Sequence, residues 1–277
     1  MKKRLLSSLF LLGCNLVYSS QPASQPASQP ASQPASQPAS QPASSYSDLN
    51  STTSFFLNTN IRSYAVITAG VDFIRTGESQ SISLLPPFSN YYASNFSYPS
   101  SASLGLGGGI EGRSSERLFW QLGVSGFFNT PVTSSGEVWQ LGLPEFNNFH
   151  YNYSIQSFRV VATGKLLSTV QERFHPYLSG ELGAAFNAAS SYQETPLIEE
   201  AVTIPPFGNH TQSSFAWGVG AGIDVDVNTT LRLGIGYQFV DLGKVSLGLS
   251  PAQATQEHLG ISNLYDHQLR FQLTALI

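Results

Sequence analysis

Apolar and polar residues alternate along eight separate segments of this chain, each of roughly ten residues. In one of them Trp217, Val219 and Ala221 alternate with glycines. Because successive side chains of a strand point to opposite faces, this period predicts strands with one apolar and one polar face. The segments are 64–73, 102–111, 118–129, 157–166, 177–187, 215–226, 231–239 and 268–277.

The connections between these segments are short and long in turn. Short links surround Ser115, Val170 and Thr229, and the other four links are several times longer. Short turns at one end and long loops at the other are typical of bacterial outer-membrane barrels, and an even strand number closes the sheet without an edge. We therefore predict an all-β fold, an eight-stranded antiparallel transmembrane up-and-down β-barrel with four long extracellular loops and short periplasmic turns.

Composition narrows the choice to a membrane barrel or a secreted all-β protein. Only 11% of the 277 residues are charged, against about 25% in soluble domains. Past the N-terminus no apolar run is long enough for a membrane helix. The formal charge of −4 disfavours nucleic acid as a partner. The single cysteine, Cys14, excludes a disulfide scaffold.

The N-terminal part of the chain is predicted to lie outside the barrel. Residues 1–20 have a basic start, an apolar stretch and small residues at the end, which are typical of a cleaved signal peptide. The segment before Cys14 also resembles a lipoprotein cleavage box, so a lipidated Cys14 remains an alternative. Residues 21–61 hold six Gln-Pro-Ala-Ser repeats and a polar lead-in, and are predicted to be a disordered linker. Residues 62–277 form the predicted barrel.

The polar faces of the predicted strands carry charges of both signs. The interior of an eight-stranded barrel is only wide enough for side chains, so these charges should pair and fill the lumen. Inward-facing glycines at 105–109 and 218–222 leave room for long side chains. The predicted lumen ion-pair network comprises Asp72, Glu111, Arg159, Lys165, Glu181, Asp224, Asp226, Arg232 and Arg270.

Three short motifs carry a resemblance to a known family. His175-Pro176-Tyr177, the run from Trp217 to Gly222 and the run from Gly236 to Gly243 resemble the outer-membrane β-barrel domains of the opacity-protein and OmpA/OmpX-like group. The resemblance covers residues 62–277. It implies a Gram-negative outer-membrane location, contact with outer-membrane lipid and insertion by the barrel-assembly machinery.

Three of the long loops share an aliphatic-Pro-x-Phe-x-Asn pattern. Proline stiffens such a segment, and its aliphatic and Phe side chains can be buried together. We expect the three segments to pack on one another above the barrel mouth. They either order the loops or form a platform for a host or cell-surface protein or glycan. The predicted platform residues are Leu85, Pro86, Phe88, Leu143, Pro144, Phe146, Ile204, Pro205 and Phe207.

Function is therefore predicted to reside in the loops of a non-enzymatic surface protein with a structural or adhesive role. A small-solute porin of the opacity family and an outer-membrane lipid-modifying enzyme remain alternatives. The five histidines are scattered, and none forms an i, i+2 pair for a metal. His175 and His267 begin strands and are expected at the membrane interface. No cofactor, catalytic residue or oligomeric state is predicted.

Overall fold

The computed structural model describes residues 61–84, 87–200, 202–203, 206–251 and 255–277. The predicted signal peptide, Cys14 and most of the predicted linker lie outside these residues. Four platform residues, Leu85, Pro86, Ile204 and Pro205, lie outside them as well. Among the described residues, no helix has the length and apolar character needed to cross a membrane.

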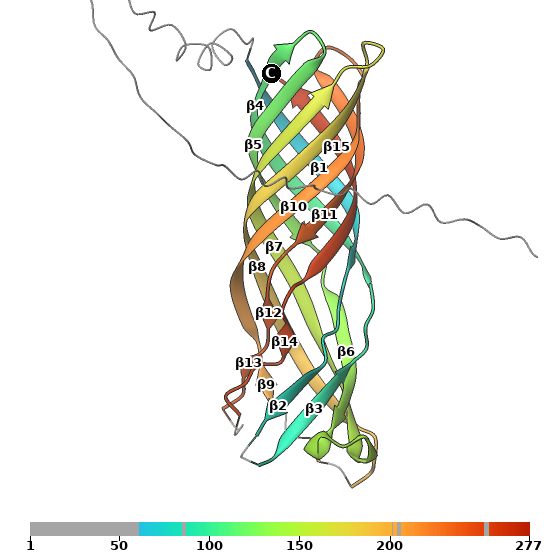
Figure 1. Ribbon diagram of the computed structural model, residues 1–277, viewed down its shortest axis with the longest axis vertical. Coiled ribbons are helices and arrows are strands. Elements are labelled where there is room, and N and C mark those ends of the chain that lie inside the picture. Colours follow the sequence, from blue (N-terminus) through green and yellow to red (C-terminus); the bar gives the residue numbers. More distant parts are fainter. Residues whose placement is uncertain (1–60, 85–86, 201, 204–205, 252–254) are drawn as a thin grey trace, which may run out of the picture. The chain divides into compact units, whose positions relative to one another are not determined.

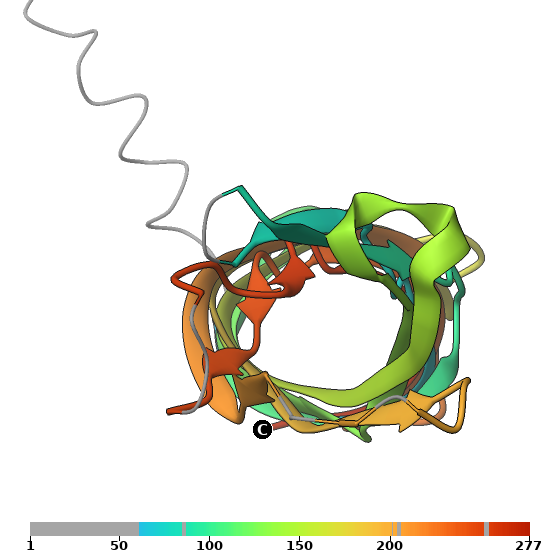
Figure 2. The ribbon, with the colours of Figure 1, turned by 90° about the horizontal axis from the view of Figure 1, so that it is seen from below.

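Eight long antiparallel strands form a closed ring, which confirms the predicted fold (Figure 1). Each strand pairs with both of its neighbours, and the last strand pairs back with the first. Viewed along its axis the ring is continuous (Figure 2). In ring order the strands are β1 (Arg62–Ile74), β4 (Ser100–Ser115), β5 (Leu118–Asn129), β7 (Asn147–Ser168), β8 (Phe174–Pro196), β10 (His210–Asp226), β11 (Leu231–Asp241) and β15 (Tyr265–Leu276).

The outer wall of this ring is apolar. Ile67, Leu106 and Phe215 are 55%, 67% and 65% exposed, and similar side chains cover the other strands. A continuous apolar band of this kind is not stable in water, whereas the acyl chains of a bilayer cover it. Aromatic side chains such as Phe73 and Tyr237 lie toward the end with the long connections. The ring thus has the outer surface of a transmembrane barrel.

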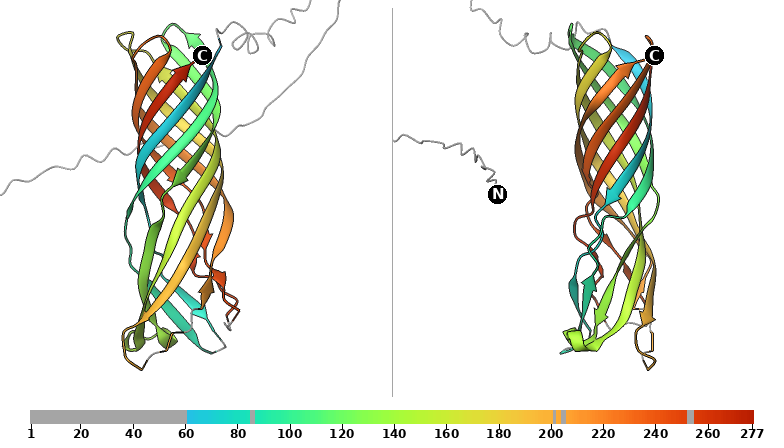
Figure 3. Two further views of the ribbon diagram at one scale, coloured as in Figure 1. Left: turned by 180° about the vertical axis from the view of Figure 1, so that it is seen from behind. Right: turned by 90° about the vertical axis from the view of Figure 1, so that its right-hand side faces the viewer.

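Strands β7 and β8 continue past the membrane-facing ring and form the base of an extracellular extension (Figure 3). Strand β6 pairs with the first half of β7, β3 pairs with β6, and β2 pairs with β3. The extension consists of these segments and the other long connections. Its elements are β2 (Gln80–Ser83), β3 (Ser89–Ser94), β6 (Val132–Trp139), η1 (Gln140–Gly142), η2 (Pro144–Phe146), β9 (Phe207–Gly208), β12 (Val245–Ser246), β13 (Gly248–Leu249) and β14 (Gly260–Ile261).

The apolar face of β7 changes sides where the strand leaves the ring. In the extension Tyr151, Tyr153 and Ile155 are buried inside. Further along, Arg159 is inside and Phe158 is on the exposed outer wall. The strand keeps its pleat, so the switch reflects a change of surroundings: lipid outside the ring, and water outside the extension. The extension therefore has a hydrophobic core of its own, and the ring has a polar interior.

Candidate functional site

A chain of ion pairs crosses the lumen near the short turns. Glu111 accepts hydrogen bonds from Arg62 at 2.7 Å and from Arg232 at 2.8 Å. Arg232 also lies 2.8 Å from one oxygen of Asp226, and the other oxygen lies 2.8 Å from Nε2 of His175. These five side chains come from five different strands. They tie the periplasmic end of the ring together.

His175 belongs to this chain of contacts, so its predicted place at the membrane interface is wrong. It shares the inward side of β8 with Tyr177 and is only 2% exposed. Its Nδ1 lies 3.1 Å from the Thr169 hydroxyl, which completes a hydroxyl, imidazole and carboxylate line with Asp226. The second contact of Asp226, to Arg232, makes this line part of the ion-pair network. His267 does lie on the outer wall, where its Nδ1 is 2.6 Å from the Tyr237 hydroxyl.

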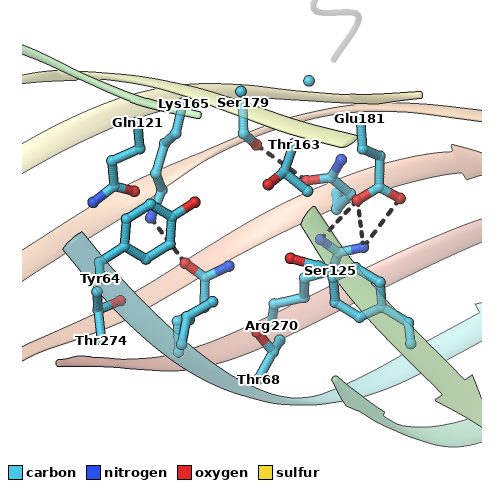
Figure 4. A pocket seen from close by; sticks show the side chains of 16 residues that line it. Tyr64, Thr68, Gln121, Ser125, Thr163, Lys165, Ser179, Glu181, Arg270 and Thr274 are labelled. Carbon is cyan, nitrogen blue, oxygen red and sulfur yellow. Dashed lines mark hydrogen bonds and ion pairs between the residues drawn. The ribbon is translucent and has the colours of Figure 1, made fainter. Parts of the chain in front are cut away.

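Lys165 holds the middle of the lumen. Its Nζ donates to Asp224 and to Gln272, both at 2.8 Å, and lies 3.7 Å from the ring centre of Tyr177. It also lines a cavity of ≈ 60 Å³, into which Glu181 and Arg270 project from two other strands (Figure 4). A cavity of this size holds a few water molecules.

Glu181 and two arginines form the next group toward the extracellular side. One carboxylate oxygen of Glu181 lies 3.1 Å from Arg159, and the other lies 3.2 Å from Arg270. Both guanidinium groups also stack on Phe127, with Cζ at 4.3 and 4.4 Å from the ring centre. The side-chain oxygen Oε1 of Gln268 accepts hydrogen bonds from both arginines, at 2.9 and 2.8 Å. Arg159 is fully buried, and its Nε and Nη2 are the guanidinium nitrogens that these hydrogen bonds engage.

Asp72 is held by neutral donors, unlike the other eight residues of the predicted network, which all form ion pairs. It accepts hydrogen bonds from Ser103 at 2.8 Å, from Gln268 at 3.1 Å and from Asn129. Gln268 also donates to Asp266 at 2.5 Å. Sequence reasoning missed the structural roles of Arg62, Phe127, His175, Asp266 and Gln268. The alternation along each strand could have placed them in the lumen, since they share its inward positions.

Two glycines make this filling possible. A Cβ at Gly105 would overlap the ring of Phe127, and one at Gly236 would overlap the hydroxyl of Tyr177. Both large side chains are nearly buried, and both contact cations of the lumen. The small inward residues therefore accept the long side chains of neighbouring strands. The result is a lumen filled at three successive levels.

The core of the extension is built around aromatic side chains. Phe207 lies against Tyr92 and Tyr192, with ring centres 5.6 and 5.2 Å apart, and Tyr151 completes the group. Burial raises the pKa of all three tyrosine hydroxyls. The Tyr192 hydroxyl donates to Glu194 at 2.5 Å, and burial raises the pKa of that carboxyl too. The extension is thus an ordered body, with polar groups enclosed beside its rings.

The three loop phenylalanines do not form the expected common cluster. Phe207 is 4% exposed inside the tyrosine group, whereas Phe88 and Phe146 are 54% and 43% exposed. They also occupy different local structures: the β2–β3 connection, η2 and β9. Of the three, Phe207 belongs to the hydrophobic core of the extension, whereas Phe88 lies in the β2–β3 connection and Phe146 in the β6–β7 connection. Phe207 is therefore separated by burial from the other two phenylalanines, and the wider platform, four residues of which lie outside the described ranges, stays a prediction.

The far end of the extension has an apolar surface that includes the exposed phenylalanines of two of the repeated loop motifs. We use the term apolar tip for Phe88, Leu141, Leu143 and Phe146, each more than two-fifths exposed. The β2–β3 connection and the η1–η2 segment that carry them lie at the end farthest from the ring (Figure 1). Segments 77–100, 130–156, 188–214 and 242–264 contain seven glutamates and one lysine. The extension is therefore acidic around an apolar end.

The closed ring, its lipid-compatible wall and its filled polar interior define the class of this protein as a transmembrane β-barrel. Within the described ranges, no group of three or more His, Cys, Asp or Glu side chains is placed to hold a metal ion. Eight of the nine predicted lumen charges are paired with an opposite charge in the lumen. What the geometry offers for contact with other molecules is the outer wall and the extension.

No protein-family model and no curated protein matches the chain. Solved outer-membrane barrels are similar to it. Neisserial surface protein A is 14% identical with a TM-score of 0.36, over 76% of this chain and 96% of that one. OprG from Pseudomonas aeruginosa is 14% identical with a TM-score of 0.41, over 77% and 96%. The outer membrane protease OmpT from Escherichia coli is 7% identical with a TM-score of 0.39, over 78% and 95%.

Proposed function

We propose that this protein is an integral outer-membrane surface protein of a Gram-negative cell, with a non-enzymatic, adhesive role carried by the extracellular extension. The observation that supports this most is the extension itself. It has a hydrophobic core separate from the membrane region, and it presents an exposed apolar tip. A barrel needs neither feature in order to span a bilayer.

The charge of the extension favours one kind of partner. The segments that form the extension contain seven glutamates and one lysine. Anionic polymers would be repelled, whereas a protein or glycan-bearing surface with an apolar centre and basic edges would fit. A partner of this kind, on a host or neighbouring cell, is what we propose the tip contacts.

Adhesion of intact bacteria tests the proposal. Escherichia coli cells displaying the protein are applied to epithelial cells and to immobilised matrix proteins and glycans. The triple variant Phe88→Ser, Leu143→Ser and Phe146→Ser should lose most of the binding of the wild type. Val227→Ser is the matched control, because Val227 is 54% exposed in the turn at the opposite end. Equal binding by wild type and triple variant would overturn the adhesive role.

One observation keeps the enzyme alternative worth a direct test. Thr169, His175 and Asp226 lie in the order of a nucleophile, base and orienting acid. The contact of Arg232 with Asp226 supports a structural role for this line instead. Incubation with labelled lipopolysaccharide should release no product with the wild type. Product that disappears in His175→Ala would establish the enzyme.

A further inference from the structure

Arg75 has an unusual environment on the outer wall of the ring. It follows β1 directly, and its backbone N–H donates to the Tyr265 carbonyl oxygen at 2.8 Å. Its guanidinium carbon lies 4.7 Å from the ring centre of Phe96 and 5.5 Å from that of Tyr265. The ion pairs found among the described residues all involve other cations. Glu78, three residues further along, is occupied by Ser262.

Aromatic faces fix the orientation of this guanidinium while leaving its N–H donors available. A cation over an aromatic ring is held by the ring's negative face, and the in-plane N–H groups still point outward. Such a planar set of donors matches the oxygens of a phosphate. Arg75 is thus arranged to receive an anion.

The surroundings of Arg75 indicate where that anion comes from. The ring centre of Tyr98 lies 6.0 Å from that of His267, and the rings of Tyr237 and Phe239 on the neighbouring strand also contact His267. These four side chains form an aromatic rim. Directly on the membrane side, Val71, Phe73 and Leu269 form an exposed apolar wall. The position therefore combines a phosphate donor set, aromatic faces and a surface for acyl chains, at the level where lipid headgroups lie.

We propose that Arg75 binds the phosphate of a phosphorylated glycolipid in the outer leaflet. The sugar of the headgroup packs on the aromatic rim, and the acyl chains lie along the apolar wall below. The inference rests on the proposed outer-membrane orientation and adds a lipid site to it. This site is separate from the apolar tip at the far end of the extension.

Native mass spectrometry of the full-length protein in detergent tests this site. The probe is a hexa-acylated, bis-phosphorylated glucosamine disaccharide lipid, compared with its dephosphorylated form. Wild type should bind the phosphorylated lipid about tenfold more tightly than Arg75→Gln does, a difference of about 1.4 kcal/mol. The dephosphorylated lipid should bind both proteins equally. Arg113→Gln is the matched control, since Arg113 also lies over a ring, 5.5 Å from Phe119, at the opposite rim.

Each outcome decides the proposal, provided that heat-dependent gel mobility shows every variant folded. Equal binding of the phosphorylated lipid by wild type and Arg75→Gln would overturn it. If inorganic phosphate occupied the Arg75 site as fully as the phosphorylated lipid and displaced it, the site would be one for a free anion, and the lipid proposal would be overturned. If the tip variant loses cell adhesion while it still binds the phosphorylated lipid, both proposals are supported. If the wild type binds the lipid but does not adhere to cells, only the adhesive role is overturned.

Discussion

At the scale of single residues, the lumen depends on carboxylates that serve two cations each. Glu181 contacts Arg159 and Arg270, and Glu111 contacts Arg62 and Arg232. Burying charges is costly, and the cost is offset only when each charge meets an opposite one with good hydrogen bonds. Removing Glu181 therefore leaves two buried guanidinium groups without a carboxylate partner, whereas after removal of Glu111 Arg232 still has Asp226.

Glu181→Gln should destabilise the barrel by about 3–5 kcal/mol, the range for breaking a buried pair from one side. Denaturant unfolding in detergent, followed by tryptophan fluorescence, measures the change. Glu116→Gln is the control, because Glu116 is an exposed carboxylate in a short turn. Coincident unfolding midpoints of wild type and Glu181→Gln would show that the network adds no stability.

Side-chain direction matters as much as identity on the same strand. Leu182 faces lipid and is 59% exposed, whereas Ser179 faces the lumen and donates to Gln238 at 3.1 Å. Leu182→Arg should cost about 2–4 kcal/mol, since an arginine then faces the bilayer. Ser179→Arg should perturb lumen packing without that lipid-facing penalty. The free energy of unfolding is measured in lipid vesicles. An unchanged value for Leu182→Arg would contradict the placement of Leu182 against lipid.

At the scale of elements, the alternation of apolar and polar residues predicted the strands of the ring because the two faces of each strand lie in different surroundings. Lipid requires the apolar face outside, and a narrow lumen admits paired charges inside, so each segment has period two over its whole length. Apart from Ile277, each of the eight segments accordingly lies within a ring strand of the structure, although β7, β8 and β10 continue well beyond their segments. The same rule placed the lumen residues on their inward side.

The alternation of apolar and polar residues did not predict the extension, because the apolar face of its strands lies inside and that of the ring strands lies outside. Residues 149–155 alternate as clearly as the ring segments, but their apolar face lies inside. Strand β6 has small polar residues such as Ser134 on its inner face, where a sequence pattern is weak. Its pairing with β3 joins segments about forty residues apart, which no local signal specifies. The loop phenylalanines were grouped by motif, although position relative to this sheet decides their burial.

Phe207 should be essential to the extension, and Phe146 should not. Phe207→Ala removes a ring from the aromatic core and should cost the extension about 3–5 kcal/mol. Phe146→Ala removes an exposed ring and should leave its stability unchanged. Limited proteolysis with chymotrypsin on intact cells reports this difference, while heat-dependent mobility checks the ring. Equal cleavage of the two variants would contradict the core described here.

The extension should also open at alkaline pH. Because burial raises the pKa of Tyr92, Tyr151 and Tyr192, folding favours the neutral phenols. Their stabilising effect is complete below about pH 10, the value for unfolded tyrosine, and is lost as pH rises through the folded values. Phenolate absorbance should therefore increase late and together with protease sensitivity of the extension. Early titration of all twelve tyrosines would contradict this.

At the scale of the whole molecule, the chain builds two bodies of opposite polarity on one continuous set of strands. The ring is apolar outside and ion-paired inside, and the extension is polar outside and aromatic inside. The ring anchors the extension in the membrane and is filled by its own side chains. We therefore expect contacts with other molecules on the extension and on the outer rim.

Single-channel recording in planar bilayers tests the central claim, that the lumen is sealed. Purified full-length wild type should give no steady conductance, because ion pairs and large side chains fill the ring at three levels. A large general porin in the same bilayer serves as the positive control, since its wider ring holds an aqueous channel. Large, steady single-channel currents from the wild type would contradict the sealed lumen and assign the protein to the small-solute porins.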